Sequence, residues 1–155
     1  MGAPTVRRIG ICDVNFGENV TVVEPLNLYG CTIGDDCFIG PFVEIQKGVQ
    51  IGHRTRIQSH AFVCELVEIG SDCFVSHGVM FVNDLFSNGG PARGNRAKWK
   101  STTIGNRVSI GTNATILPVR ICDDVVIGAG AVVTRDITDP GAYTGIPARK
   151  AGTTT

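Results

Sequence analysis

A six-residue repeat of large apolar side chains is the feature of this sequence that most restricts its fold. It begins at Ile33 and places a bulky apolar residue at every sixth position as far as Phe81. The repeat resumes at Ile104 and continues to Val133, with one five-residue step after Ile116. A short fixed period of this kind predicts a solenoid, in which each repeat stacks on the one before it.

A second series of small or β-branched residues follows the same period, offset by four residues from the first. It comprises Cys37, Val43, Val49, Thr55, Ala61, Val67, Cys73 and Val79, then Val108, Ala114, Val125 and Ala131. Glycine often follows the large residue, as at Gly34 and Gly52, where a tight corner favours a residue without a Cβ. The two series predict a three-sided prism of 18-residue coils, with stacked strands about 4.8 Å apart and large side chains on the axis.

The composition agrees with an all-β chain. Valine and isoleucine together number 33, against 5 leucines, with 20 glycines and 14 threonines. Acidic and basic residues are balanced at 14 each, so a basic surface for nucleic acid is not expected. The length suits one domain covering 1–155. We therefore expect a single all-β domain that binds neither DNA nor RNA.

Cellular location and cysteine chemistry also follow from composition. No apolar run approaches the roughly 18 residues of a membrane span, and residues 1–10 lack the apolar core of a signal peptide. The six cysteines form no C-x-x-C pair, so we expect reduced thiols, with Cys37 and Cys73 packed as small apolar groups. The sequence therefore predicts a cytoplasmic protein with no membrane association.

Three stretches depart from the repeat. Residues 84–102 have no six-residue register and carry four cations against one acid, which predicts an extruded loop able to meet phosphates. The stretch before Leu28 loses clean register and predicts an irregular first turn that caps the prism. Residues 136–155 are punctuated by proline and glycine, and we expect them to leave the prism as an extended tail.

Four segments connect this prism to a known family. They are IQSHAFVCE (57–65), VSHGVMFVNDLF (75–86), IGAGAVVTRD (127–136) and GIPAR (145–149). With the repeats, they resemble the hexapeptide-repeat acyltransferases, and within that family the bacterial N-acetyltransferases of nucleotide-linked amino sugars. The resemblance implies a left-handed parallel β-helix, acetyl-CoA as co-substrate, and a homotrimer with active sites in the clefts between subunits.

The prism geometry predicts which side chains stack. Residues 18 apart lie above one another, so Ser59 lies beneath His77, and His60 shares the corner of His77. Asn83 lies above Glu65 at the next corner. The resemblance associates the position of Asn83 with holding the sugar amine, and we expect His77 to remove the proton of that amine.

The other candidate residues fall into two sets. The expected substrate-binding residues are Glu44, His60 and Glu65 in the cleft, with Arg93 and Lys98 on the loop. The expected residues for coenzyme A are Gly111, Gly128, Ala129 and Thr134, with Arg149 or Lys150 near the 3′-phosphate. Small residues let the pantetheine arm approach the backbone, where N–H and C=O groups can bond its amides.

Three other functions compete with this hypothesis. Two histidines at one corner also suit O-acetylation of a sugar or serine hydroxyl. A hydroxyl is a weaker nucleophile than a neutral amine, so its acetylation depends more on a histidine base. A zinc site of the carbonic-anhydrase type needs a third histidine about five residues after His77, where the chain has Val82. A non-catalytic scaffold needs the repeat but neither the corner histidines nor the basic loop. We expect no metal site.

Overall fold

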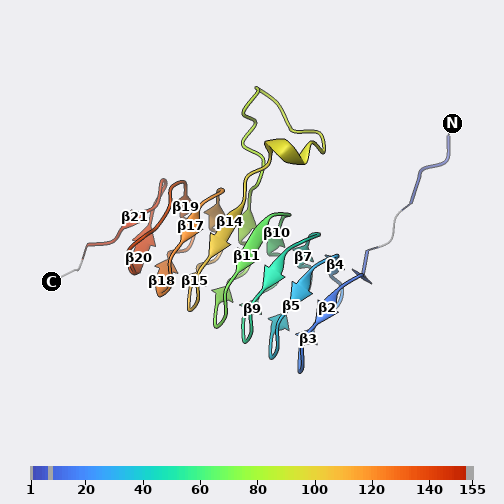
Figure 1. The fold of residues 1–155 in the computed structure, drawn as a ribbon, viewed down its shortest axis with the longest axis horizontal. Helices are drawn as coiled ribbons and strands as arrows, with labels where there is room; N and C mark the ends of the chain where they lie inside the picture. The colour runs from blue at the N-terminus through green and yellow to red at the C-terminus, as the bar shows by residue number, and fades with distance from the viewer. Residues whose placement is uncertain (1, 7–8, 153–155) are drawn as a thin grey trace.

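The computed structural model describes residues 2–6 and 9–152, and these form a parallel β-solenoid of about seven coils (Figure 1). Its architecture fits the left-handed β-helix, as the sequence and its resemblance predicted. Each regular coil contributes one short strand to each of three sheets, which are called A, B and C below. No α-helix occurs in the described residues, so none could cross a membrane.

Sheet A contains seven parallel strands. They are β1 (Ile11–Cys12), β4 (Asn27–Tyr29), β7 (Glu44–Ile45), β10 (Phe62–Val63), β13 (Met80–Phe81), β16 (Thr115–Ile116) and β19 (Val132–Val133). Successive side chains of a strand point to opposite faces, so one residue of each pair is buried and the other faces outward. The outward positions of the central strands include Phe62 and Met80.

Sheet B contains six parallel strands and presents a polar surface. They are β2 (Asn15–Phe16), β5 (Thr32–Ile33), β8 (Gln50–Ile51), β11 (Val67–Ile69), β14 (Thr102–Ile104) and β17 (Arg120–Ile121). From β5 onward the outward side chains are polar: Thr32, Gln50, Glu68, Thr103 and Arg120. This face is therefore suited to contact with water.

Sheet C contains eight strands, of which only the last is antiparallel. They are β3 (Thr21–Val22), β6 (Phe38–Ile39), β9 (Arg56–Ile57), β12 (Phe74–Val75), β15 (Ser109–Ile110), β18 (Val125–Ile127), β20 (Gly141–Thr144) and β21 (Arg149–Lys150). Its outward side chains include the exposed Phe74 and Val126, and the Arg56 guanidinium lies 4.5 Å from the centroid of the Phe38 ring.

Both predicted series fill the interior. Every member of the large and small series is buried, with at most 4% of its surface exposed. Thr55 is the one polar member, and its hydroxyl donates to Gly70 O and accepts from Cys73 N–H. Cys37 and Cys73 lie in the small series, as predicted, and all six cysteines are free. The hexad pattern thus determined the core.

The strand register records the length of each coil. Paired residues are 17 apart in the first coils, as for Ile11 and Leu28, and 18 apart from the pairing of β5 with β8 up to the projecting loop, as for Phe62 and Met80. After the loop the spacing is 17, as for Thr115 and Val132. The shorter coil results from the five-residue step between Ile116 and Ile121, which removes one residue at the corner between sheets A and B.

The first coil is regular, which corrects the prediction of an irregular cap before Leu28. Strands β1, β2 and β3 pair with β4, β5 and β6, one in each sheet. The register was hidden because two steps of the large series, from Ile11 to Phe16 and from Leu28 to Ile33, are five residues long rather than six. Ile11 and Phe16 keep the large apolar residues of the series, but they are 45% and 41% exposed because no coil covers this end.

The segment beyond residue 136 also differs from its prediction as an extended tail. Ile137 is buried and pairs with Ile121, and β20 adds to sheet C beside β18. The chain then turns back, and β21 pairs with β20 in antiparallel orientation. Repeated backbone pairing thus extends the solenoid past the last clear hexad. Residues 153–155 of the expected tail lie outside the described residues.

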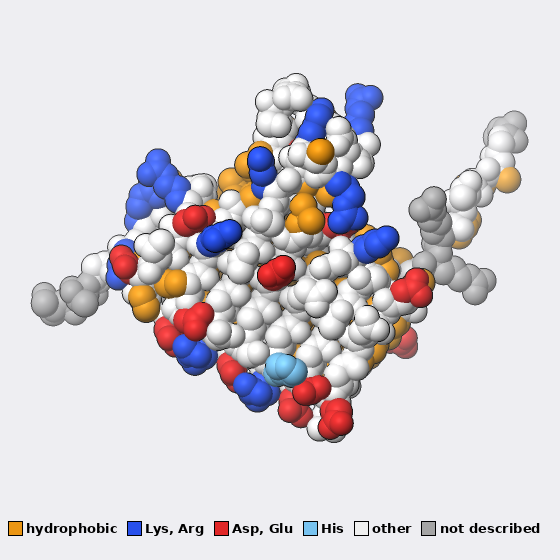
Figure 2. All heavy atoms as spheres, in the orientation of Figure 1, with side chains coloured by type: hydrophobic (Ala, Val, Ile, Leu, Met, Phe, Trp, Pro, Cys, Tyr) orange, Lys and Arg blue, Asp and Glu red, His pale blue; other side chains and the backbone are white. Residues whose placement is uncertain are grey.

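The corner between sheets B and C is a ladder of charged side chains. Arg54 pairs with Asp72, and Arg107 pairs with Asp124, both at 2.7 Å. Hydrogen bonding to these guanidinium groups holds the pKa of each carboxyl below its ordinary value. His53 lies at this corner, half exposed and 3.1 Å from Asp35, away from the other two histidines. Figure 2 shows acidic and basic side chains along this lower edge.

Candidate active site

His60 and His77 lie at the corner where sheet C turns into sheet A, which is called the histidine corner below. Ser59 Oγ lies 2.8 Å from His77 Nδ1, and the backbone N–H of Gly78 donates to Ser59 O. The predicted stacking of Ser59 beneath His77 is therefore confirmed. Both histidines are exposed, so their rings are accessible from outside the solenoid.

The backbone at this corner explains how the side chains are presented. The third corner residue has a positive φ in successive coils: Phe42, His60, Gly78, Asn113 and Gly130. A Cβ on Gly78 would lie 2.2 Å from Asn113 Oδ1, so a larger residue there would displace the Asn113 side chain. The rings of Phe42 and His60 stack with centroids 4.8 Å apart, which fixes His60 against the preceding coil.

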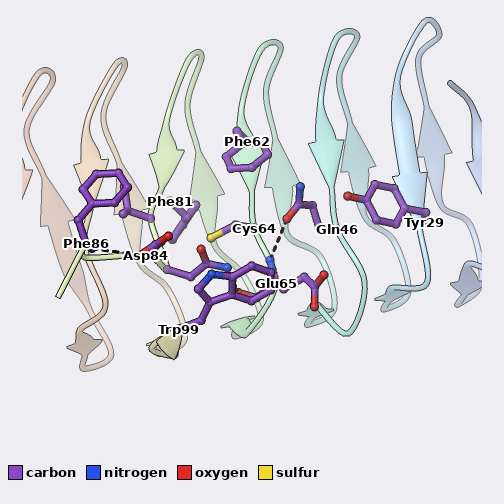
Figure 3. Close-up of a pocket in the computed structure, with 11 residues that line it drawn as sticks. Tyr29, Gln46, Phe62, Cys64, Glu65, Phe81, Asp84, Phe86 and Trp99 are labelled. Atoms are coloured by element: carbon purple, nitrogen blue, oxygen red, sulfur yellow. Dashed lines mark hydrogen bonds between the residues drawn. The ribbon is translucent and has the colours of Figure 1, made fainter. Parts of the chain in front are cut away.

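A cavity of about 410 Å³ lies at the next corner, between sheets A and B (Figure 3). This corner is called the loop corner below. The cavity is lined by Tyr29, Gln46, Phe62, Cys64, Glu65, Phe81, Val82, Asn83, Asp84, Phe86 and Trp99. Asn83 Nδ2 donates to Glu65 O, which confirms the predicted stacking of these two residues. Gln46 accepts from Glu65 N–H and donates to Glu44.

The projecting loop forms one side of this cavity. Figure 1 shows the loop, with η1 (Arg96–Lys98), leaving the solenoid between β13 and β14. Asp84 accepts from the N–H groups of Phe86 and Ala92 at 3.0 and 2.6 Å, which closes the first half of the loop. Arg96 Nη1 lies 2.6 Å from Glu65 Oε2 and forms an ion pair outside hydrogen-bond geometry. The Arg96–Glu65 pair thus ties the loop to the scaffold beside the cavity.

Two cavity groups remain protonated near neutral pH. Burial raises the pKa of the Cys64 thiol to about 12. Burial, followed by the nearby Glu44 and Glu65 carboxylates, raises the pKa of Tyr29. A thiol held protonated is a poor nucleophile. The cavity therefore offers hydrogen-bond donors and acceptors rather than a thiolate.

Sheet A separates the two predicted catalytic residues within one chain. His77 precedes β13 and lies at the histidine corner, whereas Asn83 follows β13 and lies at the loop corner. Glu44 lies on the outward face of β7, between the two corners. Arg93 is exposed on the loop, and Lys98 is half-buried in η1. Figure 2 shows Lys and Arg side chains gathered on the projecting loop.

The residues expected to bind the pantetheine arm of coenzyme A also lie at two different corners. Gly111, Gly128 and Ala129 follow β15 and β18 at the histidine corner, on the coils beyond His77. A Cβ on Gly111 would lie 2.5 Å from Ala129 N, so these coils stack too closely for a side chain there. Thr134 follows β19 at the loop corner.

The expected phosphate-binding residues lie at the end of the solenoid. Arg149 and Lys150 form β21 and line a smaller cavity of about 190 Å³ together with Arg135 and Tyr143. The Arg149 guanidinium donates to Ala148 O, which holds the side chain along the strand. These three cations outnumber the one carboxylate that also lines the cavity, that of Asp136, so the cavity favours an anionic ligand.

Sequence reasoning missed the aromatic wall of the loop-corner cavity. Tyr29, Phe86 and Trp99 come from the first coils and from both ends of the loop. The single tryptophan of the chain, next to the return of the loop, was the available signal. Within residues 2–6 and 9–152, no group of three or more His, Cys, Asp or Glu side chains is arranged to hold a metal ion.

Two family models and several curated proteins match the chain. "Bacterial transferase hexapeptide (six repeats)" matches residues 30–65, and "Hexapeptide repeat of succinyl-transferase" matches residues 101–135. The bifunctional protein GlmU of Acidithiobacillus ferrooxidans is 30% identical over 141 residues, covering 85% of this chain and 30% of GlmU. GlmU of Clostridium kluyveri is 31% identical over 139 residues, covering 86% and 27%. The chain thus spans less than a third of these relatives.

Solved structures with the same fold include two acyltransferases. A variant of AntD, an N-acyltransferase from Bacillus cereus in complex with dTDP and coenzyme A, has a TM-score of 0.72 at 23% identity, covering 89% of this chain and 82% of AntD. Galactoside acetyltransferase in complex with coenzyme A has a TM-score of 0.61 at 26% identity, covering 89% and 63%. The chain carries the hexapeptide repeats of bacterial transferases, and its sequence and fold resemble those of the hexapeptide-repeat acyltransferase family.

Proposed function

We propose that this protein transfers an acetyl group from acetyl-CoA to the amino group of a nucleotide-linked amino sugar. The observation that carries the proposal is the orientation of Asn83 in the loop-corner cavity. Its Nδ2 donates to Glu65 O, which leaves Oδ1 without a donor among the described residues. An amide oxygen accepts hydrogen bonds, so it suits the N–H groups of an amine.

The ligands bound in solved structures of the same fold support the choice of coenzyme A and a nucleotide-linked substrate. AntD was solved with dTDP and coenzyme A, and galactoside acetyltransferase was solved with coenzyme A. In this chain, the pantetheine arm would run along the histidine corner past Gly111, Gly128 and Ala129. Arg149 and Lys150 provide charge for the 3′-phosphate. On the loop, Arg93 and Lys98 would contact the phosphates of the nucleotide sugar.

The reaction needs a proton acceptor beside the amine. The amine nitrogen bonds to the acetyl carbonyl carbon while the C–S bond breaks, giving an amide and coenzyme A. The proton leaves the nitrogen for His77 and then passes to the departing sulfur. His60, Glu44 and Glu65 line the cleft between these groups. Alignment of both substrates supplies most of the rate, because it is worth roughly 7–11 kcal/mol against some 3–5 kcal/mol for a base.

The separation of His77 from Asn83 favours a site shared between two copies. The two residues flank β13 at opposite edges of sheet A, so their side chains belong to different corners of the solenoid. We propose a homotrimer in which the histidine corner of one copy faces the loop corner of the next. Thr134 then joins the other coenzyme-binding residues from across the cleft.

The distribution of apolar side chains supports this assembly. Faces A and C carry exposed Met80, Phe74 and Val126, and Phe42 at the histidine corner between them is 55% exposed. Face B is polar. Exposed large apolar side chains gathered on two faces favour an interface there. The free cysteines suit a reducing compartment, so we propose that the trimer works in the cytoplasm.

Acetyl-CoA at sub-millimolar concentration is expected to raise the melting temperature of the protein. A ligand at 100 times its Kd stabilises the folded state by about 2.7 kcal/mol, which corresponds to roughly 5–10 °C for a chain of this size. The double variant Arg149→Gln, Lys150→Gln should lose much of the shift while melting normally without ligand. Absence of any shift in the wild type favours a non-catalytic scaffold.

The Asn83→Ala variant is expected to raise KM for the amino sugar or to lower kcat, by roughly two- to tenfold. The reason is the loss of one hydrogen bond to the reacting amine, worth about 0.5–1.5 kcal/mol. Asn88→Ala, which removes an exposed amide from the loop, is the matched control and should leave both constants unchanged. Steady-state kinetics that show no effect of Asn83→Ala on either constant would remove Asn83 from the site.

O-acetylation of a sugar hydroxyl is the second candidate. The hydrogen-bonded Ser59–His77 pair favours it, because a hydroxyl nucleophile depends more strongly on a positioned base than an amine does. Galactoside acetyltransferase shares the fold. The two functions differ in the group that gains the acetyl mass, so paired amino and hydroxyl substrates distinguish them.

A further inference from the structure

We propose that Ser59 is a positioning residue that holds His77 in the tautomer with hydrogen on Nδ1 and a free lone pair on Nε2. This inference rests on the proposed function, in which His77 accepts a proton. Ser59 Oγ lies 2.8 Å from His77 Nδ1, and the two residues occupy the same corner position in successive coils. Nε2 has no hydrogen-bond partner within the described part of the chain and belongs to an exposed ring.

A neutral imidazole carries one hydrogen, and the partner of one nitrogen decides the state of the other. A hydroxyl can both accept and donate. If Ser59 accepts from Nδ1–H, then Nε2 is left unprotonated and can take a proton from the substrate. The half-buried Ser59 can direct its own O–H to water in the cleft. Only this arrangement is compatible with His77 as the proton acceptor through Nε2.

The other polar side chains near His77 have partners of their own, so Ser59 is its hydrogen-bond partner at this corner. Thr112 occupies the equivalent corner position one coil beyond His77, but its hydroxyl bonds Ser76 Oγ at 2.8 Å. His60 is stacked on Phe42. The scaffold thus supplies His77 with one orienting contact, from the coil beneath it.

During transfer, the same contact becomes stronger. As the amine nitrogen bonds to the acetyl carbon, its proton moves to Nε2 and the ring becomes an imidazolium. The Nδ1–H to Ser59 bond is then charge-assisted, which makes it shorter and stronger than the neutral bond. Ser59 therefore stabilises the transition state through His77 without touching the substrate.

The corner itself provides two well-matched variants. The equivalent position carries Pro41, Ser59, His77, Thr112 and Ala129 in successive coils. Ala129 and Thr112 show that this backbone accepts both alanine and threonine. Ser59→Ala removes the hydroxyl, and Ser59→Thr retains it. Neither variant is expected to disturb folding, which a thermal melt of each would verify.

Nitrogen-15 NMR of the full-length protein reads the tautomer directly, without substrate. The chain has three histidines, so the variants His53→Gln and His60→Gln assign the spectrum. In the wild type and Ser59→Thr, we expect the neutral His77 ring to show a protonated Nδ1 and an unprotonated Nε2. In Ser59→Ala, we expect a mixture of tautomers. A protonated Nε2 in the neutral wild-type ring would overturn the proposal.

Kinetics give a second, independent readout. Loss of a hydrogen bond to a charged group lowers rates by roughly 10- to 100-fold, so Ser59→Ala should reduce kcat by that factor with KM nearly unchanged. Ser59→Thr should restore most of kcat. Equal kcat in Ser59→Ala and wild type would also overturn the proposal. If the wild type acetylates nothing, the proposed function fails, while the NMR result still decides the tautomer.

Discussion

The His77→Gln variant is expected to lose about 10²–10⁴-fold in kcat, the usual contribution of one general base. Glutamine retains a polar side chain at the corner but cannot accept a proton near neutral pH. The loss should appear at every pH between about 6 and 9. Residual activity is expected, because aligning the two substrates contributes more than the base does.

His53→Gln is the matched control for this experiment. His53 lies at the corner between sheets B and C, beside Asp35, and takes no part in the proposed site. Its replacement should leave kcat close to that of the wild type. If His77→Gln retains full turnover over the same pH range, His77 is not the proton acceptor, and the proposal for Ser59 falls with it.

Truncation of the central apolar series is expected to produce the largest loss of stability. Ile57→Ala should lower the free energy of unfolding by about 2–5 kcal/mol, because it removes a fully buried side chain and leaves a cavity. Each coil contacts only its neighbours, so the damage falls on the coils directly above and below β9. Urea denaturation at one fixed protein concentration measures the change.

Gln50→Ala provides the comparison. Gln50 is exposed on the polar face of sheet B, and its truncation should change the free energy of unfolding by less than about 0.5 kcal/mol. A loss of comparable size in both variants would mean that stability does not depend on the hexad series. Such a result would contradict the packing described above.

The sequence predicted the core well because the solenoid is periodic. In a periodic fold, residues at the same position of successive repeats are buried to the same extent. The large and small series could therefore be assigned to the core from their spacing in the sequence alone. The stacking of Ser59 with His77 and of Asn83 with Glu65 followed from the same 18-residue spacing. Handedness came from the resemblance to a known family, since right-handed crossovers are the usual case.

The ends of the solenoid were harder to predict. At its N-terminal end, the large series takes five-residue steps from Ile11 to Phe16 and from Leu28 to Ile33, which break the six-residue register. At its C-terminal end, Ile137 follows Val133 by four residues rather than six, which obscures the last coil. Backbone hydrogen bonds to the adjacent coil maintain both segments without a clear side-chain signal.

The loop-corner cavity could not be predicted for a different reason. Residues 84–101 lack periodicity, so nothing in the sequence specifies how the loop returns to the scaffold. The contacts of Asp84 with Ala92 and of Arg96 with Glu65 determine where Trp99 and Phe86 lie. These contacts depend on tertiary structure. The candidate amine-binding residue Asn83 was identified by resemblance, whereas its aromatic surroundings emerged only from the fold.

Mass spectrometry of candidate acceptors tests the central claim most directly. Wild-type protein and acetyl-CoA would be incubated with UDP- and dTDP-linked 3- and 4-amino sugars, each paired with the analogue that carries a hydroxyl in place of the amine. The account predicts a gain of one acetyl mass on an amino sugar and none on its hydroxyl partner. Acetylation of the hydroxyl analogues alone would contradict it.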